Sequence, residues 1–235
     1  MLRWCPLGVH DLSYSFVIPT LNEETSVERL LPQLRARFPN AQLVVVDGGS
    51  RDHTRALARP LCDKLIESAP GRARQMNLGA QQAFGEYLLF LHADSFPGLD
   101  ECQLQLYLAS KPPWGFCRVS LEGKEMVFRI ISYFINARSR ATRVATGDQM
   151  LFIHRDFMQR AGGFDDIPLM EDVAFSKRLR KLAPPQWIKE PVATSSRRWR
   201  EAGVLRTVVK MWALRFAYFI GVSPQHLWHY YYGDD

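Results

Sequence analysis

Cysteine is scarce in this sequence. The 235 residues include four cysteines, Cys5, Cys62, Cys102 and Cys117, which lie far apart and form no CxxC pair. A zinc cluster or a disulfide framework needs cysteines at characteristic spacings, so neither is expected. Reduced thiols of this kind are typical of cytoplasmic proteins.

Long apolar runs are also missing. The most apolar stretch, residues 211–222, is a dozen residues long and contains Arg215, whereas a membrane-spanning helix needs about 20 apolar residues. Residues 1–10 hold no continuous apolar run, so no secretory signal is expected. We expect a cytoplasmic protein, with peripheral contact of the C-terminal helical region on the inner face of the membrane as an accessory hypothesis.

The charge is unevenly distributed along the chain. The formal net charge is +6, and residues 1–120 hold 12 basic and 12 acidic side chains, against 18 and 12 in residues 121–235. The whole excess therefore lies in the second half. A basic region attracts phosphate groups, an anionic membrane or nucleic acid, and charge by itself does not choose between them.

Short apolar runs alternate with amphipathic stretches in the first half. Strands are predicted at residues 15–18, 43–46, 64–66 and 87–91, and helices at 23–38, 52–59 and 72–84. Successive strand–helix–strand units imply a parallel sheet with helices on both faces. In such α/β sheets, ligands bind beyond the carboxyl ends of the strands.

The second half has a less regular pattern. Helices are predicted at residues 126–136, 171–182 and 203–232, the last of them broken near 221–224, and a strand is predicted at 149–153. The chain shows no fixed-period repeat. With 47% hydrophobic residues it can bury the core of one domain.

Polar groups follow three of the predicted strands. Asp47 ends a buried strand, where a carboxylate needs hydrogen-bond donors, and we expect a nucleotide base or ribose to supply them. Asp94 closes the most apolar strand and suits Mg²⁺ or Mn²⁺, which prefer oxygen ligands. Its other reading is a helix cap, but Pro97 and Gly98 separate it from the next helix.

Further candidate groups lie at predicted helix starts. The segment GRARQMN at 71–77 places two arginines at a helix N-terminus, which favours anions, although a solvated basic turn explains it equally well. Glu171 and Asp172 are adjacent carboxylates at a helix start; one can be stabilised there by the helix dipole while the other serves as a general base.

Two clusters near the C-terminus carry weaker signals. Residues 195–200, SSRRWR, combine arginines with a tryptophan, but no RNA-binding pattern accompanies them, so nucleic acid is the weaker reading. His226 and His229 have the spacing of a metal pair, yet no third ligand is signalled nearby.

Four segments taken in order carry a family resemblance. IPTLNE at 18–23, VVVDGGSRD at 44–52, LFLHAD at 89–94 and MED at 170–172 resemble family 2 glycosyltransferases of the GT-A fold, over roughly residues 14–200. The His-Ala-Asp motif, residues 71–77, GDQ at 147–149 and PLMED at 168–172 look like one subgroup. It comprises the small bacterial glycosyltransferases associated with radical-SAM/selenodomain proteins and arsenosugar biosynthesis.

This resemblance implies an α/β, GT-A-type sheet in one domain, with a nucleotide-binding half (14–120), an acceptor and catalytic half (121–200) and C-terminal helices (201–235). It implies transfer of a sugar, with inversion, from a nucleoside-diphosphate donor, UDP- or GDP-linked, to a small-molecule or lipid-linked hydroxyl acceptor. Asp172 would be the base, with Glu171 beside it. Mg²⁺ or Mn²⁺ would bind Asp94, and His92, which stands where the family motif has its first Asp, is the second candidate metal ligand. The residues implied to hold the nucleotide sugar are Pro19, Thr20, Glu23, Asp47, Arg72, Arg74, Gln75, Asn77, Asp148, Arg197 and Arg198.

Two alternatives stay open at this point. A sugar-nucleotide nucleotidyltransferase would share the α/β layer, but residues 19–23 lack a glycine-rich, lysine-bearing phosphate loop. A non-enzymatic module could use Arg206, Lys210 and Arg215, which lie among apolar residues in an interfacial pattern, to bind a membrane surface or nucleic acid. An NAD-dependent enzyme is excluded because no GxGxxG follows the first strand.

Overall fold

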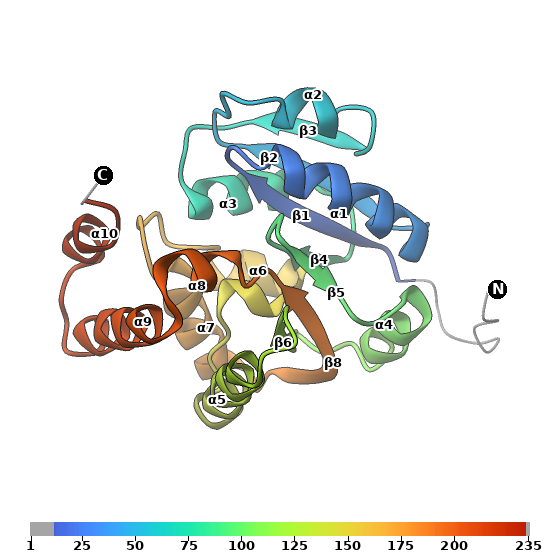
Figure 1. The fold of residues 1–235 in the computed structure, drawn as a ribbon. Coiled ribbons are helices and arrows are strands. Elements are labelled where there is room, and N and C mark those ends of the chain that lie inside the picture. Colours follow the sequence, from blue (N-terminus) through green and yellow to red (C-terminus); the bar gives the residue numbers. More distant parts are fainter. Residues whose placement is uncertain (1–11, 234–235) are drawn as a thin grey trace.

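A computed structural model describes residues 12–233 and shows one eight-stranded sheet with helices on both faces (Figure 1). The strand order is β3-β2-β1-β4-β7-β6-β8-β5. The strands are β1 (Tyr14–Thr20), β2 (Gln42–Asp47), β3 (Lys64–Glu67), β4 (Tyr87–Phe90), β5 (Ser95–Pro97), β6 (Trp114–Leu121), β7 (Leu151–His154) and β8 (Gln186–Thr194).

The helices connect these strands and continue beyond the last one. They are α1 (Glu24–Arg37), α2 (Thr54–Ala58), α3 (Arg72–Gln82), α4 (Glu101–Leu108), α5 (Met126–Thr142), α6 (Arg155–Ala161), α7 (Glu171–Leu182), α8 (Arg197–Ala202), α9 (Val204–Phe219) and α10 (Pro224–Tyr232), with a 3₁₀ turn at Gly147–Gln149.

The first four strands are parallel, as the sequence predicts. Adjacent residues of β1 face opposite sides of the sheet: Phe16 packs in the cluster that includes α1, whereas Val17 packs in the cluster that includes α3. Because both faces are covered, β2 and β4 are apolar almost throughout. The register pairs Thr20 with Asp47, which brings the carboxyl ends of β1 and β2 to one edge.

The second half of the chain adds strands of both directions to the sheet. β7 pairs antiparallel with β4 and with β6, and β8 runs parallel to β6. The sequence patterns predicted β7 but not β6, β8 or β5. Lys189, Glu190 and Pro191 interrupt the apolar pattern of β8, where the register to β6 shifts between Cys117 and Arg118. This shift lets the end of β8 reach β5, so that Ser95 lies opposite Thr194.

Acidic side chains accept backbone hydrogen bonds at the starts of two helices. The predicted helix at 52–59 starts at Thr54, and the Asp52 carboxylate accepts the Thr54 N–H at 3.0 Å. α4 starts at Glu101, and its cap is Asp100, which accepts the Gln103 N–H at 2.9 Å in a capping box. Asp94 is therefore not a helix cap.

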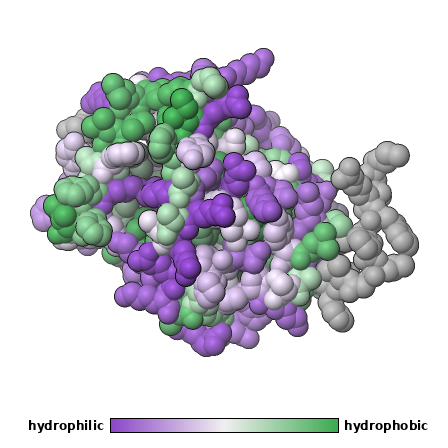
Figure 2. Space-filling view, turned by 90° about the horizontal axis from the view of Figure 1, so that it is seen from below, coloured by the Kyte–Doolittle hydropathy of each residue, from purple (hydrophilic) through white to green (hydrophobic). Residues whose placement is uncertain are grey.

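The C-terminal helices lie beside α5 and α7, on the left in Figure 1. The predicted break in residues 203–232 is real: Gly221 has φ 96°, and Ser223 caps α10 by accepting the His226 N–H. Leu214 and Leu227 pack with Val173 in a small separate cluster. Hydrophobic residues remain visible on this side of the surface (Figure 2). Within residues 12–233, no helix combines the length and apolarity that a membrane crossing requires.

Replacing Gly115 by alanine should destabilise the sheet where its halves meet. A Cβ at this position of β6 would lie 2.2 Å from the Gln186 carbonyl oxygen and 2.4 Å from the Phe152 ring. Overpacking of this kind costs about 1–3 kcal/mol of unfolding free energy. Urea denaturation measures the loss, and Lys181→Ala on an exposed helix end is the control. Equal stability of Gly115→Ala and the wild type would contradict the described packing.

Candidate active site

A cavity of about 730 Å³ lies at the carboxyl edge of the sheet. Its walls come from the ends of β1 and β4, the start of α3, the 146–148 turn, the start of α7, and helices α5, α9 and α10. Eight of the predicted site residues line it: Pro19, Glu23, Arg72, His92, Asp94, Asp148, Glu171 and Asp172. The fold thus brings predicted site residues from distant parts of the chain together around one cavity.

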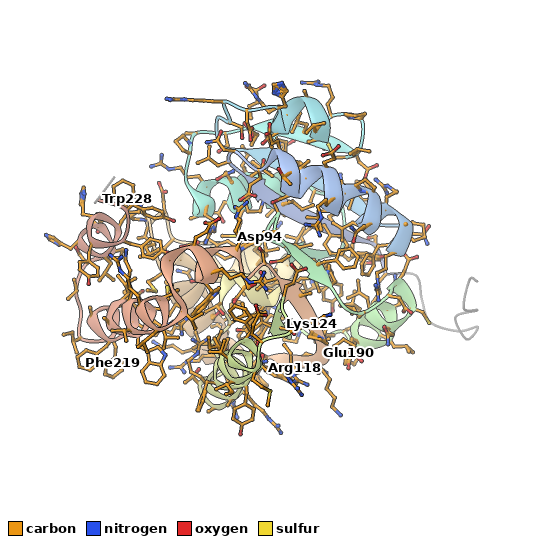
Figure 3. All side chains as sticks on the ribbon, in the orientation of Figure 1. Asp94, Arg118, Lys124, Glu190, Phe219 and Trp228 are labelled. Carbon is orange, nitrogen blue, oxygen red and sulfur yellow. The ribbon has the colours of Figure 1, made fainter. Side chains whose placement is uncertain are left out.

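Asp94 lies between β4 and β5, near the centre of the molecule in Figure 3. Its side chain is exposed to the cavity, and one carboxylate oxygen accepts a hydrogen bond from the Ser95 hydroxyl at 3.3 Å. Its backbone carbonyl accepts the Ser195 N–H at 3.2 Å. The end of β8 therefore fixes the backbone of Asp94 and leaves its carboxylate accessible.

Asp172 is held in place by two backbone groups. Its Oδ2 accepts the N–H of Gly147 at 2.6 Å, and its Oδ1 accepts the N–H of Val173 at 2.7 Å. A Cβ on Gly147 would stand 2.4 Å from His92 Nε2 and 3.6 Å from Asp172 Oδ2. The imidazole and the carboxylate therefore both lie against this glycine, and the close approach requires that residue 147 have no side chain.

Glu171 is buried beside Asp172. Burial and the negative charge of Asp172 together raise the pKa of Glu171 to about 7, against the opposite effect of Arg72, whose Nη1 is 3.6 Å from the Glu171 carboxylate. Burial would lower the pKa of Arg72, but Glu171, Tyr232, Asp172 and Asp94 together raise it above its ordinary value. Arg72 is thus a stable cation that faces the carboxylates of the cavity.

Asp148 belongs to a second charged group in the cavity. Burial raises the pKa of Asp148, although Arg138 and Arg215 lower it. Burial and the positive charge of Arg215 together lower the pKa of Arg138 to about 10. Sequence reasoning did not assign Arg138 or Arg215 to the site. One sequence feature could have indicated Arg215, because it is a cation inside the most apolar stretch of the chain.

Asp47 does not line the cavity, and one premise of its prediction is wrong. The buried carboxylate finds its donors in its own turn: Oδ1 accepts the N–H groups of Gly49 at 3.0 Å and Ser50 at 2.9 Å, and Oδ2 accepts from the Ser50 hydroxyl. No ligand is needed to satisfy it. The contact with a nucleotide stays a prediction.

Five more predicted nucleotide-binding residues, Thr20, Arg74, Gln75, Asn77 and Arg197, are not among the described residues that line the cavity. Gln75 Nε2 donates to the carbonyls of Thr20 and Val46, both at 2.8 Å, and so ties β1 to β2. Asn77 exchanges two hydrogen bonds with the backbone of Phe164. Arg74 pairs with Asp166 at 2.8 Å, and Arg197 approaches Glu201 at 3.9 Å. The side chain of Arg198 lies outside the described residues.

The donor set fits a divalent cation that is shared with a ligand. Within residues 12–233, no three His, Cys, Asp or Glu side chains form a metal site by themselves. Mg²⁺ and Mn²⁺ are often held by one or two carboxylates together with phosphate oxygens and water. An accessible Asp94 beside Arg72 suits that arrangement. With Asp172 in the same cavity, the site can combine phosphate binding with removal of a proton by a general base.

Comparison with known families gives a match in the first half of the chain. Residues 15–129 match the family model Glycosyl transferase family 2. An uncharacterized glycosyltransferase of Mycobacterium tuberculosis is 29% identical over 189 residues, which cover 74% of this chain and 71% of that protein. An uncharacterized glycosyltransferase of Haemophilus influenzae is 28% identical over 100 residues, 39% of this chain and 40% of that protein.

Two solved structures show the similarity of the fold. The mannosyltransferase PcManGT from Pyrobaculum calidifontis, in complex with GDP-Man and Mn²⁺, has a TM-score of 0.61 at 21% identity and covers 79% of this chain and 57% of its own. TarS 1–349 from S. aureus, in complex with UDP, has a TM-score of 0.64 at 15% identity, with coverages of 78% and 60%. The chain thus spans little more than half of these relatives. The expected GT-A fold is confirmed.

The raised pKa of Glu171 should make stability depend on pH. Between pH 4.5 and about 7 the folded protein holds a proton that the unfolded chain releases, so the unfolding free energy falls as the pH rises. Glu171→Gln removes this contribution and should flatten the fall by about 1–3 kcal/mol. Urea denaturation across this pH range measures it, with exposed Glu122→Gln as the control. Parallel profiles for wild type and Glu171→Gln would rule the shift out.

Proposed function

We propose that this chain, whose residues 15–129 match the family 2 glycosyltransferase model, transfers a sugar from a nucleoside-diphosphate donor to a hydroxyl acceptor with inversion at the anomeric carbon. The observation that carries the proposal is the convergence of Asp94, Arg72 and Asp172 on one cavity. The complexes of PcManGT with GDP-Man and of TarS with UDP-GlcNAc support a sugar nucleotide as the donor.

The donor diphosphate would lie between Asp94 and Arg72. Asp94 would hold a divalent cation, which would supply positive charge to stabilise the departing diphosphate. Arg72 adds a guanidinium from the start of α3, and a guanidinium stays protonated throughout the working pH range. Pro19 and Glu23 border the same part of the cavity, at the end of β1.

The acceptor would be activated by Asp172. The acceptor oxygen attacks the anomeric carbon, the bond from that carbon to the diphosphate oxygen breaks with its electron pair leaving on the nucleotide, and the hydroxyl proton passes to Asp172. Gly147 and Val173 each occupy one carboxylate oxygen with a single N–H donor. Their hydrogen bonds orient the carboxylate, and each oxygen keeps a further lone pair for the proton.

Residues outside the cavity lining would act by positioning. Gln75 and Asp47 hold the ends of β1 and β2, and Asn77 holds the segment before α7. The proposal retains the three parts of the chain, 14–120 for the nucleotide, 121–200 for the acceptor and 201–235 for the C-terminal helices. The motifs at 71–77, 147–149 and 168–172 support the radical-SAM/selenodomain-associated subgroup and its link to arsenosugar biosynthesis.

Asp172→Asn should reduce sugar transfer by at least about 100-fold, because general-base catalysis contributes that much. Donor binding should remain nearly unchanged, since the amide retains the shape of the carboxylate. Initial rates and calorimetric donor titration measure the two effects separately. Asp156→Asn, on an exposed side chain of α6, is the matched control. Loss of donor binding together with turnover would point to a structural role for Asp172.

Asp94→Ala should remove the effect of Mn²⁺ on donor affinity. Wild-type protein titrated with UDP- and GDP-sugars should bind one class more tightly when Mn²⁺ is present, whereas the variant should bind it equally with and without the ion. Calorimetry or thermal shift measures this difference. An unchanged Mn²⁺ effect in Asp94→Ala would remove Asp94 from the metal site.

A further inference from the structure

Exposed apolar side chains are concentrated on one side of the molecule. Of the nineteen large apolar residues that are exposed in the described chain, fifteen belong to α5, α9, α10 and the turn between the last two helices. α9 buries only Leu214 among its sixteen residues. On α5 the exposed residues are Met126, Val127, Ile130, Tyr133 and Phe134; on the C-terminal helices they include Val209, Trp212, Phe216, Phe219 and Trp228. Figure 2 shows hydrophobic residues gathered at one edge of the lower face, and Figure 3 labels Phe219 and Trp228 on the C-terminal helices. We call the surface of α5, α9 and α10 the apolar face.

Charge on the apolar face has one sign. Residues 126–147 contain four arginines and no acidic residue, and residues 202–233 contain Arg206, Lys210 and Arg215 and no acidic residue. Exposed aromatic and aliphatic side chains next to cations alone are the composition of an interfacial membrane helix. A protein partner would equally cover apolar residues, but the absence of any acidic group favours a surface that is uniformly anionic.

The apolar face continues into the cavity. Phe134 of α5 and Trp212 of α9 are 57% and 67% exposed, and both also line the cavity beside Asp94 and Asp172. Ile131, Ile135, Val208 and Met211 extend the same wall inward. The hydrocarbon chain of a ligand can therefore extend from the outer surface toward the carboxylates in contact with apolar side chains.

Two cations line the inner end of this wall. Arg138 comes from α5 and Arg215 from α9, and burial lowers the pKa of both. In the described chain neither guanidinium lies within ion-pair distance of a carboxylate, although Asp148 and Asp172 act on both from further away. Half-buried guanidiniums without a close carboxylate are suited to a phosphate group of a ligand.

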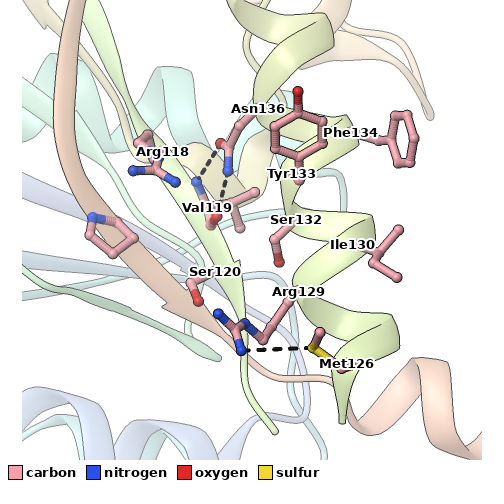
Figure 4. A pocket seen from close by; sticks show the side chains of 11 residues that line it. Arg118, Val119, Ser120, Met126, Arg129, Ile130, Ser132, Tyr133, Phe134 and Asn136 are labelled. Atoms are coloured by element: carbon pink, nitrogen blue, oxygen red, sulfur yellow. Dashed lines mark hydrogen bonds between the residues drawn. The ribbon is translucent and has the colours of Figure 1, made fainter. Parts of the chain in front are cut away.

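A second cavity, of about 630 Å³, lies between α5 and β6 (Figure 4). It combines the apolar residues Ile130, Tyr133 and Phe134 with Arg118 and Arg129. Asn136 exchanges hydrogen bonds with the backbone of Val119 and thereby fixes α5 against the strand. The outer side of α5 thus repeats the same pairing of apolar side chains with guanidiniums.

We propose that the apolar face lies on an anionic membrane surface and that the acceptor is a lipid of that membrane, its headgroup phosphate between Arg138 and Arg215 and its tail along the wall of Phe134 and Trp212. The acceptor part rests on the proposed glycosyl transfer. The headgroup hydroxyl then takes the place of the attacking oxygen, with the same bond changes and the same proton transfer to Asp172.

Vesicle flotation tests the membrane surface. Wild-type protein should float with vesicles of three parts phosphatidylcholine to one part phosphatidylglycerol, bind vesicles of phosphatidylcholine at least tenfold less, and detach as salt concentration rises. The double variant Phe216→Glu, Phe219→Glu changes exposed residues outside the cavity lining and should bind at least tenfold less. Phe84→Glu, an equally exposed phenylalanine elsewhere on the molecule, should bind as the wild type does.

Three results would overturn the proposed contact of the apolar face with a membrane. The first is that the wild type does not float, and the second is that the double variant floats as well as the wild type. The third is a stable wild-type dimer that the double variant abolishes, because such a dimer would assign the apolar face to a second copy of the chain. Thermal shift with UDP- and GDP-sugars reports donor binding independently. Donor binding without flotation would reject the membrane proposal alone, whereas flotation without donor binding would reject the glycosyltransferase proposal.

Label transfer tests the acceptor. The assay contains Mn²⁺, vesicles of total bacterial membrane lipid and a radiolabelled donor of the class that the thermal shift selects. Label should enter the lipid phase with the wild type and not with Asp172→Asn. Arg138→Gln and Arg215→Gln should each lower this transfer at least tenfold through a raised KM for lipid while donor affinity is kept. Label confined to a water-soluble product, or a lipid KM that stays equal to the wild-type value in both arginine variants, would overturn the lipid acceptor.

Discussion

The hydrogen bond from the Gly147 N–H to the Asp172 carboxylate joins the parts of the chain on which the site depends. Gly147 lies before β7, Asp172 opens α7, and the His92 ring that follows β4 packs against the same glycine. Three segments are thereby fixed at one point without a bound ligand. A carboxylate restrained in this way approaches a substrate in a defined orientation, which is what preorganisation in catalysis requires.

Charge in the cavity is arranged in two groups. Arg72 lies among Asp94, Glu171 and Asp172 near the carboxyl ends of the parallel strands, while Arg138 and Arg215 lie with Asp148 on the helical side. In the first group, Arg72 and Asp94 lie within residues 15–129, which the family 2 match covers, whereas Glu171 and Asp172 come from the start of α7 beyond it. All three residues of the second group lie outside that match. The α/β layer would thus bind the donor, and the added helices would determine the acceptor.

The sequence predicts the first half of the fold well, because β1, β2 and β4 are short apolar runs with helices between them. It misses β8, whose Lys189, Glu190 and Pro191 break the pattern at a register shift, because strand pairing and not local composition forms that strand. The position of Asp94 follows from strand ends that meet at one edge, whereas Asp172 reaches the same cavity from the start of α7. The donors of Asp47 and the position of Arg138 could not be predicted, since the former are backbone N–H groups of a turn and the latter depends on how α5 packs on β6.

The turn after β2 has a consequence for binding kinetics. Its carboxylate, hydroxyl and amide groups already satisfy one another, and Ser50 also accepts the Asn22 N–H from the neighbouring loop at 2.9 Å. A ligand that arrives at this edge meets two loops that are ordered before contact. Little chain entropy is then lost on association, so encounter can proceed without a slow conformational step.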